Sequence, residues 1–148
     1  MKAVCDSGPL FAAVSDTDEA HVLATALVSE LGSEVLIPLP VVVEVDQLLR
    51  SRVTDHAARM FLAAVSAGEH SVAYVTPGLL RRAVEIDAQF ADLQLGFVDA
   101  AVMAVAEREE LPILTFDFRD FRAAPPERHR AWPLIIDEER YARAVRLR

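Results

Sequence analysis

The chain has 148 residues, 53% of them hydrophobic, and a formal net charge of −8 at pH 7. This size fits one domain whose core needs no disulfide or structural metal, and the acidity argues against broad, non-specific nucleic-acid binding, which depends on basic patches. The lone Cys5 excludes an internal disulfide, the lone Lys2 excludes a P-loop, and the short apolar runs exclude a membrane span, so a cytoplasmic protein is expected.

The first half of the chain predicts short strands that alternate with helices. Short apolar runs indicate the strands, and apolar residues spaced by three and four indicate the helices. Acidic residues, prolines and glycines mark where the helices begin and end. In chain order we expect a strand at 2–5, a turn at 6–9, a helix from 16–19 to Leu31, a strand at 34–37, a helix from Pro40 to about Arg50, and a helix from about Thr54 to Gly68.

The second half continues the same alternation. Thr76 and Pro77 form an N-cap and first-turn pair, which predicts the start of a helix. The residues Leu95 and Gly96 interrupt the helical pattern before a very apolar segment. The expected elements are a strand at 71–75, helices at 76–90 and 97–110, strands at 112–116 and 132–136, a turn at 117–120, and a charged tail that can form a helix.

This order of elements predicts an α/β fold. Strands that alternate with helices form a parallel sheet, here of four to five strands, with helices on both faces. No linker divides the chain, so residues 1–148 are expected to form a single domain, in which 121–148 supply a C-terminal strand and tail. Ligands of such sheets bind outside the carboxyl ends of the strands.

Four carboxylates occur where this fold can bring them together. Asp6 and Asp117 directly follow predicted strands, Glu44 follows the apolar run 41–43 on a helix, and Asp99 lies in the first turn of the very apolar helix. Each alone also fits a simpler role: a turn or cap residue, a solvent-facing acid, or an acid paired with an arginine. Together, they would repel one another unless a divalent cation such as Mg²⁺ or Mn²⁺ neutralised them.

The chain resembles the PIN-domain nucleases, most closely the VapC-type toxins of bacterial toxin–antitoxin pairs. The stretch Leu95-Gly96-Phe97-Val98-Asp99-Ala100 is the most specific part of the match. The order and spacing of the motifs extend the likeness from the first strand to about Phe121. The segments that carry the resemblance are 4–8, 43–45, 92–100 and 114–117.

The resemblance implies an α/β/α sandwich and Mg²⁺- or Mn²⁺-dependent cleavage of RNA. It also implies a homodimer and a cognate antitoxin protein as partners, with no membrane. Ser7 and Thr115 would be polar supports, with a purely structural role as turn and strand-end residues as the equal alternative. Asp120 lies close enough to Asp117 to compete for the fourth place. Carried over by position, the catalytic and metal-binding residues would be Asp6, Glu44, Asp99 and Asp117.

Two other enzyme or signalling functions would need residues that this chain lacks. A phosphoaspartyl phosphatase that used Asp6 as its nucleophile would need a second acid two residues on, where this chain has Gly8, and a downstream lysine, which is missing. A phospho-receiver domain needs a late lysine too. A catalytically inactive PIN-like binding or scaffold module is the alternative that remains. The acidity of the chain counts against an RNA-binding protein, although a cation site would account for part of it.

Overall fold

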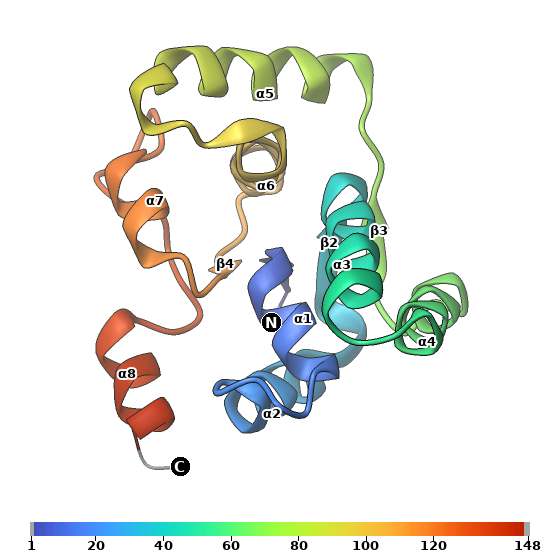
Figure 1. Ribbon diagram of the computed structural model, residues 1–148. Coiled ribbons are helices and arrows are strands. Elements are labelled where there is room, and N and C mark those ends of the chain that lie inside the picture. Colours follow the sequence, from blue (N-terminus) through green and yellow to red (C-terminus); the bar gives the residue numbers. More distant parts are fainter. Residues whose placement is uncertain (1, 147–148) are drawn as a thin grey trace.

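Four short strands form the parallel sheet that the sequence predicts. The computed structural model describes residues 2–146, and in it the strands lie in the order β3-β2-β1-β4 (Figure 1). In the middle of the sheet, Val4 pairs with Leu36 on one side and with Ile113 on the other. The strands are β1 at Ala3–Cys5, β2 at Val35–Pro38, β3 at Ser71–Ala73 and β4 at Ile113–Leu114.

Helices flank this sheet, and their order confirms the predicted α/β class. In the view of Figure 1, α6 lies on one side of the strands and α1 on the other. Short 3₁₀ turns at Gly32–Glu34 and Ala91–Leu93 link some of the elements. The helices are α1 at Ser7–Val14, α2 at His21–Leu31, α3 at Leu39–Arg52, α4 at Asp55–Ser66, α5 at Pro77–Gln89, α6 at Gly96–Glu109, α7 at Phe118–Ala123 and α8 at Glu138–Arg146.

The N-terminal boundaries differ from the prediction in two places. The expected turn at 6–9 is the start of α1, because the Asp6 side chain accepts a hydrogen bond from the Ser7 N–H and caps the helix. Proline is tolerated in a first turn, so Pro9 does not prevent it. The helix expected from 16–19 begins only at His21, and 16–20 form turns in which Asp18 accepts a bond from the Ala20 N–H. Such local side-chain bonds compete with helix formation.

The C-terminal boundaries differ as well. The expected turn after β4 is the short helix α7 at Phe118–Ala123. The predicted fifth strand at 132–136 is reduced to a single parallel bridge between Ile113 and Leu134. The Pro133 carbonyl accepts a bond from Ile113, but Pro133 has no N–H of its own with which to extend the ladder.

The helix α6 forms the centre of the hydrophobic core. Its residues 100–106 are all buried, and it packs against β1, β2, α3 and α5. Cys5 is fully buried beside it, and burial raises the pKa of its thiol well above the usual value. No helix within residues 2–146 is long and apolar enough to cross a membrane.

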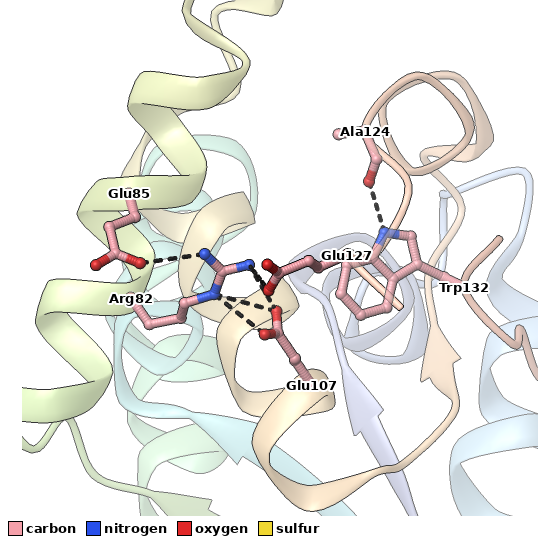
Figure 2. A network of polar contacts seen from close by, with 6 residues as sticks. All are labelled: Arg82, Glu85, Glu107, Ala124, Glu127 and Trp132. Atoms are coloured by element: carbon pink, nitrogen blue, oxygen red, sulfur yellow. Dashed lines mark hydrogen bonds and ion pairs between the residues drawn. The ribbon is translucent and has the colours of Figure 1, made fainter. Parts of the chain in front are cut away.

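A polar network fastens the segment after α7 to the rest of the fold (Figure 2). Arg82 of α5 donates hydrogen bonds to Glu107 of α6, at 3.1 and 3.2 Å, and forms an ion pair with Glu127 at 3.7 Å. Nearby, the Trp132 indole N–H donates to the Ala124 carbonyl at 2.7 Å. These contacts lie at the C-terminal end of α6, while Asp99 lies in the first turn of the same helix.

Candidate active site

Asp6 lies at the carboxyl end of β1, where the central strand leaves the sheet. It is only 5% exposed. One carboxylate oxygen accepts the Ser7 N–H at 2.8 Å, and the other accepts the hydroxyl of the fully buried Thr115 at 2.9 Å. These bonds lower the pKa of Asp6, but burial outweighs them and raises it to about 6. The two hydrogen bonds therefore fix the orientation of the Asp6 carboxylate, while burial makes its charged form unfavourable.

Asp117 is joined to Asp6 through a single hydroxyl group. The Thr115 oxygen that donates to Asp6 also accepts the Asp117 N–H at 3.0 Å. Asp117 is in turn the N-cap of α7, where its carboxylate accepts the Asp120 N–H at 3.2 Å. Burial and the neighbouring Asp117 carboxylate raise the pKa of Asp120. Thr115 thus fixes the spacing between the acids that follow β1 and β4.

Asp99 approaches the same place from the first turn of α6. The chain enters this helix through the buried Leu95 and through Gly96, whose φ of 82° favours glycine. A helix N-terminus normally stabilises a carboxylate. Here burial dominates, followed by the charges of Asp6 and Asp117, and together they raise the pKa of Asp99 to about 8. A cation beside Asp99 would therefore stabilise the charged form of its carboxylate.

Glu44 comes from the third direction, on α3. This helix packs against α1, and the Ser7 hydroxyl donates a hydrogen bond to the Glu44 carboxylate. Ser7 is the first residue of α1, directly after Asp6. The family resemblance implies that Ser7 is a polar support of the site, and in the structure its hydroxyl contacts Glu44.

The four carboxylates expected from the sequence all line one open hollow of about 590 Å³. Within residues 2–146, the tightest acidic group consists of Asp99, Asp117 and Asp120, whose oxygens lie within 4.8 Å of one another. The sequence predicts that Asp120 competes with Asp117 for the fourth place, whereas in the structure both belong to the same group of acids. The sequence signal for this arrangement is their separation by three positions, which is the spacing between a helix N-cap and its third helical residue. The hollow is lined by Asp6, Ser7, Gly8, Glu44, Leu95, Gly96, Phe97, Val98, Asp99, Phe116 and Asp117.

The donor set fits a hard divalent cation. Mg²⁺ and Mn²⁺ prefer carboxylate oxygens, and the polar side chains here are carboxylates and one hydroxyl. In the part of the chain that the structure describes, no arginine or lysine forms a salt bridge with Asp6, Asp99 or Asp117. The charges that raise the pKa of Asp6 and of Asp99 are therefore not offset by a salt bridge to a protein cation. Asp99 and Asp117 would hold the ion, with Asp6, Glu44 and Asp120 around them.

We expect Asp117→Asn to lower the affinity for Mn²⁺ more than Asp120→Asn does, by a further factor of about 10. Asp117 lines the hollow and its N–H donates to Thr115, whereas Asp120, whose N–H donates to the Asp117 carboxylate, does not line it. Titration of each variant with Mn²⁺, followed by electron paramagnetic resonance, measures the difference. Asp87→Asn, which changes an exposed acid on α5, is the matched control. A greater loss in Asp120→Asn would assign the fourth place to Asp120.

Comparison with known proteins adds three findings. The PIN domain family model matches residues 3–125. Ribonuclease VapC26 of Mycobacterium tuberculosis (strain ATCC 25618 / H37Rv) is 26% identical over 124 residues, which are 83% of this chain and 92% of that protein. Among solved structures, the fold is similar to that of Mycobacterium tuberculosis VapC20, a sarcin-ricin loop cleaving toxin, with a TM-score of 0.76 and 22% identity over 89% of this chain and 100% of that one.

Two further solved structures share the fold with a TM-score of 0.63 each. One is a toxin–antitoxin complex from Klebsiella pneumoniae, 20% identical, covering 84% of this chain and 93% of the other. The second is VapBC2 from Rickettsia felis bound to a DNA fragment from their promoter, 12% identical, covering 84% of this chain and 94% of the other. At these identities, the similarity establishes the fold.

Proposed function

Because the chain belongs to the PIN domain family, we propose that it is a metal-dependent endoribonuclease that acts as the toxin of a bacterial toxin–antitoxin pair. The observation that carries the proposal is the convergence of Asp6, Glu44, Asp99 and Asp117 on one hollow that no arginine or lysine of residues 2–146 lines. The ribonuclease VapC26 is a relative over most of this chain, which supports the same reaction class. A PIN-like module without activity would have no need to maintain so costly a group of acids.

The chain's own residues supply position and charge at this site. Thr115 and the Ser7 N–H fix the carboxylate of Asp6, and the Ser7 hydroxyl fixes Glu44. The raised pKa values of Asp6 and Asp99 mean that protons leave these groups when a cation binds. A bound Mg²⁺ or Mn²⁺ would activate water and neutralise charge on the phosphodiester. The openness of the hollow leaves room for an RNA backbone.

The proposal includes two protein partners and a cytoplasmic location. The net charge of −8 favours a basic antitoxin, and such complementarity also steers association. Two of the solved relatives are toxin–antitoxin assemblies, which supports this partner. For the homodimer, the support is apolar side chains exposed on one helix: Leu80 and Val84 of α5 are 46% and 57% exposed and lie one turn apart.

Growth on induction is the direct test in cells. Expression of this chain alone should slow growth, and Asp6→Asn should relieve the arrest because it keeps the helix cap but removes the charge. Sequencing RNA 5′ ends after induction would map the cut and so show whether transfer RNA, ribosomal RNA or messenger RNA is the target. If Asp6→Asn were as toxic as the parent chain, at equal expression, the catalytic assignment would be wrong.

A further inference from the structure

We propose that the C-terminal helix α8 positions the acid-bearing segment 116–120 through the ring of Tyr141. This inference rests on the proposed function, because it assigns a task at the same site. It concerns a part of the chain beyond residue 125, where the family match ends. Tyr141 is here a positioning residue: its contacts are with the neighbours of Asp117.

The aromatic contacts bracket Asp117 on both sides. The Tyr141 ring lies 4.7 Å from the Phe116 ring and 5.6 Å from the Phe118 ring, centre to centre, in tilted arrangements. Tilted rings at these distances attract one another beyond the area that they bury. Phe116 lines the acidic hollow, and Phe118 is the first residue of α7. One side chain of α8 therefore holds the residues before and after Asp117.

The helix α8 is itself fastened at two places, so it can act as a support. Tyr141 and Val145 pack against a small group of buried alanines, Ala12 of α1 together with Ala20 and Ala24. On the other side, Arg122 of α7 forms an ion pair with Glu138. Figure 1 shows α8 beside α7, and α8 also contacts α2. A helix fastened to both α1–α2 and α7 can hold two parts of the site in register.

The segment that α8 covers follows a very short strand, and its hydrogen bonds are short-range, although Phe118 is buried in the main core. The strand β4 has two residues. In the segment that leads from it to α7, the Asp117 N–H donates to the Thr115 hydroxyl, and the Asp120 N–H donates to the Asp117 carboxylate. Short-range hydrogen bonds at the end of an edge strand of two residues can open locally. Packing of Phe116 and Phe118 against Tyr141 opposes that opening. The position of Asp117 therefore depends on an aromatic side chain from the end of the chain.

Two variants and a matched control test the inference on the full chain. Tyr141→Ala should speed hydrogen exchange at the amides of Asp117 and Asp120 by at least about 10-fold, with little change in β1, because only the local opening becomes easier. It should also lower Mn²⁺ affinity about 10-fold, the usual effect of removing an outer support. Tyr141→Phe keeps the ring and should restore both. Val145→Ala removes only packing on the alanine group and keeps the aromatic contacts, so it should change both quantities far less than Tyr141→Ala does.

The outcomes separate this inference from the proposed function. Equal exchange rates and Mn²⁺ affinity in Tyr141→Ala and the parent chain would overturn the inference. So would equal losses in Val145→Ala, since α8 would then act only on general stability. If Tyr141→Ala does not fold, Tyr141→Leu serves in its place, with faster exchange at the same two amides expected. Exchange is read without metal or RNA, so a parent chain that cleaves no RNA would refute the proposed function and leave this test intact.

Discussion

Replacing Asp99 by asparagine is expected to lower Mn²⁺-dependent RNA cleavage by at least about 100-fold, because changes one shell further out already cost about 10–100-fold. Asparagine has nearly the same shape and keeps one oxygen, so the fold should be retained. It loses the negative charge, which burial and four neighbouring acids make unfavourable unless a cation is bound. The measurement is the cleavage rate of an RNA that contains the mapped site, with Mn²⁺ in excess.

The control for this experiment is Asp92→Asn. Asp92 is exposed and lies seven positions before Asp99, in the 3₁₀ turn that precedes α6. Its loss changes the net charge by the same amount, so any general electrostatic effect on RNA binding appears in both variants. An Asp99→Asn enzyme as fast as the control would contradict the assignment of Asp99 to the site.

Removing the metal should make the protein less stable as the pH rises. The pKa values of Asp6 and Asp99 are raised in the folded state, to about 6 and about 8, above the ordinary value of 3.8. Between pH 4 and 8 the folded protein therefore binds more protons than the unfolded chain, and the free energy of unfolding falls as pH increases. This loss is absent below pH 4 and complete above about pH 8.

Asp99→Asn should weaken that trend by a measurable amount, because only the contribution of Asp6 then remains. Without metal at pH 8, the variant should be more stable than the parent by about 2 kcal/mol, after allowance for partial solvent screening and for the lost attraction to the α6 dipole. At pH 4 the two should be equal. With Mn²⁺ at 100 times its dissociation constant, the parent should gain about 2.7 kcal/mol and the variant much less, so the order inverts.

Urea unfolding at pH 4, 6 and 8, with and without a chelator, measures this dependence. Asp87→Asn on α5 controls for the general effect of net charge. A parent protein that is most stable at pH 8 without metal would show that Asp6 and Asp99 do not carry the repulsion described here. A variant that gains as much from Mn²⁺ as the parent would place the cation elsewhere.

The sheet and the larger helices could be predicted because their boundaries have local chemical signals. Thr76 and Pro77 begin α5, and Thr54 caps α4. The prediction of turns in place of the short helices α1 and α7 was wrong, because no local signal distinguishes a turn from a helix there. Both begin with an aspartate whose side chain accepts a backbone N–H, and the same bond is made in a turn and in a helix cap. Only packing decides between the two, and packing is non-local.

The same distinction applies to the candidate site. That Asp6 and Asp117 meet follows from a rule about strand ends, which needs only the order of elements. The contact between Ser7 and Glu44 requires α3 to pack on α1, and the group of Asp99 with Asp120 requires α6 to meet α7. The contribution of Tyr141 depends on the path of the chain after Trp132, where the expected strand becomes a single bridge. No local pattern encodes these approaches.

Anomalous diffraction from crystals soaked in Mn²⁺ is the most direct test of the account. It predicts one or two peaks in the hollow, with the carboxylate oxygens of Asp99 and Asp117 among the ligands and Asp6 close by. Crystals of Asp99→Asn soaked in the same way should show a weaker peak or none. A fully soaked parent crystal with no peak in the hollow, or with an arginine side chain in the place of the ion, would contradict the central claim.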